Sequence, residues 1–133
     1  MSWDQWTTNM LENKEVAEAA ICGKEGGIWS ASDMFKGITP DEIKALYAGT
    51  EGPGNGSIVN LAGIKAMVLK TEESNGNKVI TLVTMKNTVM SESSPLVIGF
   101  FKTGLVIGLG KPGFRSVGVT VESTTSQLKN RGL

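Results

Sequence analysis

The second half of the sequence carries a run of strand-forming segments joined by short turns, and this run constrains the fold more than any other feature. The pair Asn75-Gly76, which separates two of the segments, is the strongest short hairpin signal in the chain. Connections this short join neighbouring strands in antiparallel order, so the sequence predicts an antiparallel sheet. The segments are rich in β-branched and apolar residues and span residues 57–61, 64–70, 78–86, 95–102 and 105–110.

The last two segments, PLVIGFFK and LVIGLG, are almost continuously apolar. A strand with one face in water would instead alternate apolar and polar residues, so these segments indicate a sheet that is buried on both faces. We therefore expect helices against each face of the sheet.

The first residues predict a helix. Ser2 can cap its N-terminus, and Gln5 three residues later completes a capping box. Trp3, Trp6 and Met10 then recur at helical spacing and share one face of that helix. From spacing alone, we expect these side chains to pack in an apolar core.

A hairpin and a second helix are predicted next. The turn at residues 24–27 separates two apolar runs, so residues 16–32 are predicted to form a β-hairpin. Thr39 is a good N-cap, Pro40 fits the first helical position, and acidic residues fill the first turn. The second helix is therefore predicted to begin at Thr39.

The tail VGVTVESTTSQLKNRGL fits two structures. Its Val and Thr content favours a strand. Its apolar residues, however, recur at helical spacing, and Gly132 suits the end of a helix. The pattern favours a helix whose buried face would hold Val117, Val121, Thr124 and Leu128.

Residues 1–133 contain no repeats, low-complexity segments or linker, which predicts one domain. The longest apolar stretches are far shorter than the roughly 20 residues of a membrane-spanning helix, and we recognise no secretion signal. Cys22 is the only cysteine, so no intrachain disulfide can form, and its apolar neighbours predict a buried side chain. These features favour a reducing compartment.

The net charge of zero argues against nucleic acid as the main partner. The charge is unevenly distributed, however. Residues 1–64 hold four Lys and nine Asp or Glu, a net of −5, whereas residues 65–133 hold nine Lys or Arg and four Glu, a net of +5. Two interpretations stay open: scattered surface charge, or a basic face from the second half that suits an acidic partner.

The residue types that most enzymes use are missing from this sequence. Without histidine, Ser-His-Asp and Cys-His arrangements and histidine zinc sites cannot form, and no carboxylate pair stands out as a general acid and base. Residues 108–113, GLGKPG, match a dinucleotide fingerprint, but Pro112 interrupts it and only 20 residues follow. The sequence therefore predicts neither an enzyme nor a site for a metal or cofactor.

The order of these motifs resembles that of the profilins along essentially the whole chain. The matching stretches are SWDQW, AAICGKEGGIWSAS, GITPDEI, LAGIKAMVLK, KTGLVIGLGKPG and a tail ending in Gly-Leu, whereas residues 78–103 keep the strand pattern with little residue identity. The resemblance implies an α+β fold. In that fold, N- and C-terminal helices cover one face of a central antiparallel sheet and shorter helices cover the other.

The resemblance also implies the partners. Profilins bind actin monomers and the proline-rich segments of filament-elongating proteins, many bind phosphoinositide headgroups, and they regulate actin polymerisation without being enzymes. We therefore expect a cytoplasmic, cytoskeleton-associated protein with these partners.

For proline-rich ligands, the resemblance implies a groove with aromatic walls. Trp6 stands where the family more often has tyrosine, and Gln127 stands where it usually has an aromatic residue or histidine, which removes one wall. The contact residues that the resemblance implies are Trp3, Trp6, Asn9, Trp29, Leu128 and Leu133.

For actin, the resemblance implies a face formed by the later strands and the start of the last helix. All six implied residues belong to the half of the chain with net charge +5, so the basic face has a candidate acidic partner. These residues are Lys65 and Lys70 in a well-matched stretch, Phe114 and Arg115 before the last helix, and Lys86 and Lys102 in or near the weakly matched region.

Two other hypotheses stay open. Gln127 and the divergent residues 78–103 are compatible with a profilin-fold module that has lost one activity, and that binds only proline motifs or only sequesters actin. A carrier of small apolar ligands is a further alternative, although no sequence feature favours it beyond apolar strands.

Overall fold

Seven strands form one antiparallel sheet within residues 2–47, 54–74, 76–113 and 115–133, which are the residues that the computed structural model describes. The strand order is β2-β1-β7-β6-β5-β4-β3, and the neighbouring pairs are antiparallel, which confirms the predicted pairing. The strands are β1 (Val16–Gly23), β2 (Ile28–Ala31), β3 (Ile58–Leu61), β4 (Ile64–Ser74), β5 (Asn77–Thr84), β6 (Pro95–Phe101) and β7 (Gly104–Gly110).

The predicted segments differ from these strands mainly in β4, which continues four residues beyond the expected end at Lys70. Glu72 and Glu73 are exposed and polar, so the apolar pattern stops before the strand does. Backbone pairing with β5 extends β4 beyond its apolar residues, and Glu73 lies opposite Lys78. Asn75 of the predicted hairpin turn lies outside the described residues, and Gly76 in that turn has φ of 79°.

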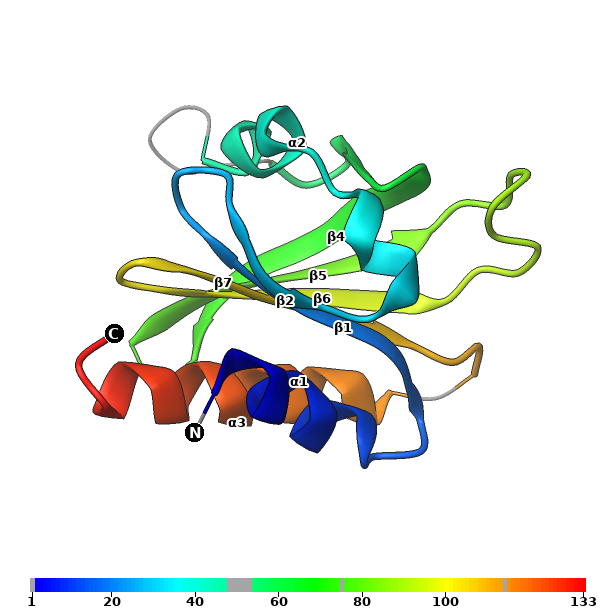
Figure 1. Ribbon diagram of the computed structural model, residues 1–133. Coiled ribbons are helices and arrows are strands. Elements are labelled where there is room, and N and C mark those ends of the chain that lie inside the picture. The colour runs from blue at the N-terminus through cyan, green and yellow to red at the C-terminus, as the bar shows by residue number, and fades with distance from the viewer. Residues whose placement is uncertain (1, 48–53, 75, 114) are drawn as a thin grey trace.

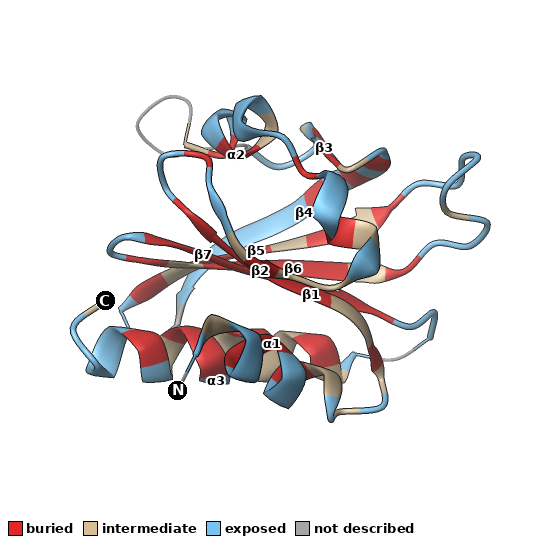
Figure 2. Cartoon of the chain, in the orientation of Figure 1, coloured by how far each residue is buried: buried red, intermediate tan, exposed pale blue. Residues whose placement is uncertain are grey.

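Helices cover both faces of the sheet, as predicted (Figure 1). The helices α1 (Trp3–Leu11) and α3 (Ser116–Asn130) lie side by side on one face, and the 3-10 helix η1 (Asp33–Gly37) and α2 (Pro40–Ala45) lie on the other. Every residue of β7 is buried, in agreement with its continuous apolar sequence (Figure 2). The core under α1 and α3, called the helix-pair core below, contains Trp6, Met10, Val16, Ala19, Ile21, Val79, Val97, Phe101, Val106, Val117, Val121 and Leu128.

Both predicted helix starts are confirmed. The Ser2 hydroxyl accepts a hydrogen bond from the Gln5 backbone N–H, and the Gln5 side chain accepts one from the Ser2 N–H, which completes the capping box. Thr39 and Glu42 form the same arrangement at the start of α2, with Pro40 in the first turn. Local polar residues therefore fix where each helix begins.

The tail folds as the helix α3, and the four predicted positions on its inner face are buried. Its sequence has poor helix propensity, so packing must supply the stability. Glycines in the sheet make that packing close: a Cβ on Gly108 would lie 2.5 Å from the Val121 side chain, and one on Gly99 would overlap the Thr125 hydroxyl. The Thr125 hydroxyl is satisfied by donating to the Val121 carbonyl at 2.7 Å.

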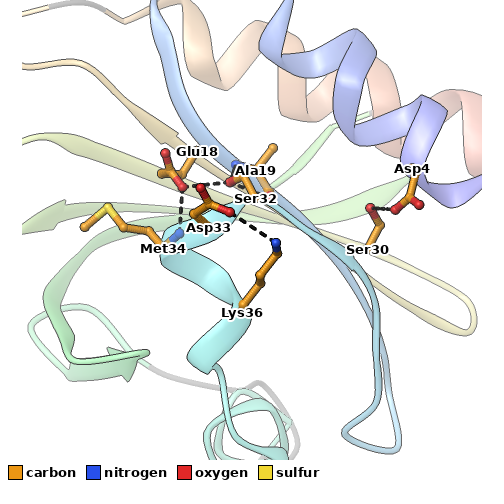
Figure 3. Close-up of polar contacts among 8 residues, drawn as sticks. All are labelled: Asp4, Glu18, Ala19, Ser30, Ser32, Asp33, Met34 and Lys36. Carbon is orange, nitrogen blue, oxygen red and sulfur yellow. Dashed lines mark hydrogen bonds and ion pairs between the residues drawn. The ribbon is translucent and has the colours of Figure 1, made fainter.

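Two polar contacts tie other elements to the sheet. The Glu18 carboxylate on β1 accepts hydrogen bonds from the Ser32 hydroxyl (2.9 Å) and the Met34 N–H (2.8 Å), which holds η1 against β1 (Figure 3). The Glu42 carboxylate on α2 accepts from the N–H of Ala62 in the β3–β4 turn at 3.0 Å. Ala62 has φ of 53°, in the left-handed region that residues with a Cβ rarely adopt.

Cys22 is fully buried in the core, as expected. Burial raises the pKa of its thiol to about 12, so the side chain is an unreactive neutral thiol near neutral pH. Within the described part of the chain, no helix has the length and apolar character to cross a membrane.

Candidate functional site

Aromatic side chains from α1, β2 and β6 form a series of ring contacts that leads outward from the helix-pair core. The Trp3 and Trp29 rings lie against each other, with centroids 4.6 Å apart and planes tilted by 36°. The Trp29 and Phe101 centroids are 6.0 Å apart at 50°. Trp3 and Trp29 are half-buried and pack on the core from outside. The two indoles therefore keep aromatic area open to solvent, whereas Phe101 belongs to the core.

Gly23, at the end of β1, leaves the space that the Trp29 ring occupies. A Cβ on Gly23 would lie 2.9 Å from three atoms of the indole ring, so only glycine lets the ring lie flat over this strand. Gly23 is not among the residues predicted for this site, because a glycine at a strand end next to a turn carries no signal that a ring packs over it.

A polar anchor made by Asp4, Thr7 and Ser30 holds α1 against β2. The Ser30 hydroxyl donates to the Asp4 carboxylate at 2.6 Å (Figure 3) and lies 2.8 Å from the Thr7 hydroxyl. Asp4 follows Trp3 and Ser30 follows Trp29 in the sequence. The anchor therefore fixes the two indoles relative to each other.

The end of α3 returns the chain to the same core. Gly132 has φ of 82°, and its N–H donates to the Lys129 carbonyl at 2.9 Å, while the Leu133 N–H donates to the Leu128 carbonyl at 3.2 Å. These two bonds form a Schellman motif, which reverses the chain direction after a helix. The half-buried Leu133 consequently packs on the helix-pair core, as Trp3 and Trp29 do. We call Trp3, Trp29 and Leu133 the aromatic surface.

A second surface lies where β4, β5 and the start of β6 meet the first turns of α3. It surrounds an open hollow of about 700 Å³. Leu69 on β4 and Val119 on α3 line this hollow and are 50% and 69% exposed, so they leave apolar area uncovered. A register shift between Val68 and Lys70 explains why both Leu69 and Lys70 are exposed.

Charged side chains also line this hollow. Lys70 and Arg115 supply positive charge, and Glu72 and Glu122 supply negative charge. Lys70 forms an ion pair with Glu72 at 3.4 Å, with both side chains about half exposed. We call Leu69, Lys70, Arg115 and Val119 the mixed surface, because it combines open apolar area with charge.

The family model for Profilin matches residues 1–133. The chain belongs to the profilin family. The fold is that of mouse profilin IIa in complex with a double repeat from the FH1 domain of mDia1, which is 24% identical over all of both chains, with a TM-score of 0.83. Rat profilin 2a is 23% identical over 98% of this chain and 96% of its own, with a TM-score of 0.82. LokiProfilin1, solved in complex with rabbit actin, is 19% identical over 98% of each chain, with a TM-score of 0.67.

The six residues predicted for proline-rich ligands divide into two groups in this profilin. Trp3, Trp29, Leu133 and Asn9 have accessible surface. Trp6 is only 5% exposed and Leu128 is fully buried, so both support the aromatic surface from below. Spacing could place these residues on helical faces, but it could not distinguish the outer layer of a face from the layer beneath.

Gln127, which the resemblance places at a position usually held by an aromatic residue or histidine, is exposed on α3. Its amide donates to the Ser123 hydroxyl at 3.1 Å, one turn earlier in the same helix. The side chain therefore lies along α3, where it offers no flat wall to a ligand.

The residues predicted for actin are only partly brought together in this profilin. Lys70 and Arg115 line the hollow, and Lys65 is exposed on the same strand as Lys70. Lys86 is exposed just beyond β5, near Lys65, since the Met85 N–H donates to the Lys65 carbonyl at 2.7 Å. Lys102 lies instead in the β6–β7 turn, at the opposite end of β6 from the hollow-lining Pro95. Phe114 lies outside the described residues.

Proposed function

We propose that this profilin binds proline-rich segments on its aromatic surface and monomeric actin on its mixed surface. The arrangement of Trp3 against Trp29 is the single observation that carries the first half of the proposal. The rings are packed from below, anchored from the side, and open to solvent above. A soluble monomer would gain stability by covering such rings, so their exposure favours a binding role.

A polyproline II helix suits this surface physically. It has no internal hydrogen bonds and is extended before it binds, so binding costs little chain entropy. Flat indole rings can contact the pyrrolidine rings, and each aromatic residue offers about 150–250 Å² of area. The indole N–H groups and the exposed Asn9 amide can donate to ligand carbonyls, which have no partners of their own. The solved complex of mouse profilin IIa with an FH1 repeat supports this assignment.

The structure changes the role that we assign to two predicted contacts. Trp6 and Leu128 are too buried to offer area to a ligand, so we propose that they hold the aromatic surface in place. Direct contact is proposed for Trp3, Asn9, Trp29 and Leu133.

The mixed surface suits a protein partner. Open apolar side chains rimmed by charges are typical of the centre and rim of a protein interface. Leu69 and Val119 would supply buried area, whereas Lys70, Arg115 and the nearby Lys65 would speed encounter with acidic actin. The complex of LokiProfilin1 with rabbit actin supports this assignment.

Tryptophan fluorescence tests the first half of the proposal. Addition of a proline decamer to the wild-type protein is expected to shift the emission, because Trp3 and Trp29 would become covered. Trp3→Ala is expected to lose that response while keeping the cooperative unfolding transition. A wild-type protein that gives no response at millimolar decamer would contradict the assignment.

Titration with actin monomer tests the second half. Lys70→Glu with Arg115→Glu is expected to weaken binding at least tenfold while leaving the decamer response intact. Lys102→Glu is the matched control, since it reverses an exposed lysine distant from the hollow, and it should bind actin as the wild type does. Equal actin affinities for the double variant and the wild type would show that the surface is wrongly placed. A decamer response without any actin binding would instead favour the module that has lost one activity.

A further inference from the structure

Arg131 lies at the edge of the aromatic surface, in a position that the proposed function does not yet use. Its guanidinium carbon lies 5.2 Å from the centre of the Trp6 ring, within the range of a cation–π contact. The Arg131 backbone N–H donates to the Leu128 carbonyl at 3.1 Å, which fixes its backbone in the last turn of α3, and its side chain reaches Trp6 on α1. The guanidinium is therefore held over the indole.

The position of Arg131 places its charge next to the proposed ligand. Trp6 is one helical turn after Trp3 on the same face of α1, and Leu133 is two residues after Arg131. Arg131 is exposed, whereas the Trp6 ring beneath it is almost completely buried. A ligand lying over Trp3 and Leu133 would therefore pass beside the guanidinium.

No described carboxylate lies within ion-pair distance of the Arg131 guanidinium. A guanidinium carries five N–H donors in a planar fork, so a cation–π contact with one ring leaves donors that match the geometry of a carboxylate. Arg131 can therefore donate hydrogen bonds to an acidic group from outside the chain.

We propose that Arg131 selects proline-rich ligands that carry an acidic residue beside the proline run. This inference rests on the proposed function of the aromatic surface and adds a preference among its ligands. The indoles recognise the shape of the polyproline helix, which every proline run shares. Arg131 distinguishes one run from another by its flanking charge.

The experiment uses decaproline peptides blocked at both ends, with a single Asp or a single Asn placed directly before or directly after the prolines. Tryptophan fluorescence titration at low salt gives the affinity of each peptide for the wild type, Arg131→Gln and Arg131→Lys. Lys111→Gln is the matched control, because it removes an exposed cation before the other end of α3, outside both proposed surfaces.

For the wild type, we expect the Asp peptide to bind about twofold to fivefold tighter than its Asn partner at one of the two positions, as for an exposed ion pair. The preference should disappear in Arg131→Gln, persist in part in Arg131→Lys, remain in Lys111→Gln, and decline as salt is added.

Two results would overturn the inference while leaving the proposed function intact. Equal affinities of the wild type for Asp and Asn peptides at both positions would mean that Arg131 only covers Trp6. A preference that persists in Arg131→Gln would assign the selection to another residue. If none of the peptides, the plain proline decamer included, changes the fluorescence, the proposed function fails, and this inference fails with it.

Discussion

The aromatic surface and the mixed surface differ in how the fold supports them. Trp3 and Trp29 are fixed by ring packing, by the anchor among Asp4, Thr7 and Ser30, and by the absence of a side chain at Gly23. Leu69 on β4 and Val119 on α3 are exposed side chains, and among the described residues no comparable network of ring contacts and hydrogen bonds holds them in place. A rigid, pre-formed surface suits a stiff ligand such as a polyproline helix. A shallow surface with charges suits a large folded partner that supplies its own shape.

A substitution at Gly23 should separate the two surfaces most strongly, because it should weaken decamer binding while changing actin binding little. Gly23→Ala would place a Cβ against the Trp29 ring and push the indole off its position, which should weaken decamer binding at least tenfold. Overpacking should also cost about 1–3 kcal/mol of unfolding free energy. Fluorescence titration and urea unfolding measure the two effects.

Gly27→Ala is the matched control for that change, because a Cβ at Gly27, in the same hairpin, meets no atom within 4 Å. It should leave decamer affinity unchanged. Actin affinity should change little in either variant. If Gly23→Ala bound the decamer normally, the packing of Trp29 on β1 would not matter for binding.

The mixed surface should respond to loss of its open apolar area. Leu69→Ser combined with Val119→Ser should weaken actin binding about tenfold, since two side chains no longer contribute buried area. Both residues are exposed, so stability should change by no more than about 0.5 kcal/mol for each. Calorimetric titration with actin monomer measures the affinity.

Ile28→Ser removes an equally apolar, exposed side chain from β2, outside the lining of the hollow, and should not affect actin binding. An equal loss of actin affinity in this control would indicate a general effect of surface hydrophobicity. The mixed surface could then not be assigned as the actin site.

A smaller effect is expected from the polar anchor of the aromatic surface. Ser30→Ala removes the hydrogen bond to Asp4 and leaves the Thr7 hydroxyl without its partner on β2, which should cost about 1–2 kcal/mol of stability. Decamer affinity should fall threefold to fivefold because α1 is held less firmly against β2. Ser123→Ala on the outer face of α3 should alter neither quantity, and a normal decamer affinity in Ser30→Ala would limit the anchor to a role in folding.

The smallest effect is expected in the β3–β4 turn, whose residues belong to neither surface. Ala62→Gly removes the cost of a left-handed alanine, about 1–2 kcal/mol, but adds freedom to the unfolded chain, about 0.4–1 kcal/mol. A net gain in stability of about 0.5 kcal/mol is expected from urea unfolding. Both binding affinities should stay within error of the wild type, and a loss of stability would show that packing by the Ala62 methyl outweighs its strain.

Sequence patterns predicted much of this fold because the decisive signals were local. The capping boxes begun by Ser2 and Thr39 involve residues three positions apart, and the apolar run in β7 records burial on both faces. The helical tail was harder to predict. Its propensity favours a strand, and the glycines that let α3 pack closely lie in other elements, at Gly99 and Gly108.

The sites were less predictable than the fold because they depend on contacts between distant segments. The resemblance to profilins pointed to Trp3 and Trp29, but only the structure shows Gly23 beneath Trp29. The exposure of Leu69 depends on a shift in strand register, which no sequence pattern indicates. The resemblance also implied that Leu128 contacts the ligand, whereas its position on the inner face of α3, which the spacing had indicated, leaves it fully buried.

The central claim is that the aromatic and mixed surfaces are separate and can be occupied together. Titration of actin monomer into this profilin, with and without saturating proline decamer, tests it most directly. The account predicts that the two actin dissociation constants agree within about twofold, because no residue is shared between the surfaces. A decamer that displaces actin, or that weakens its binding tenfold or more, would contradict it.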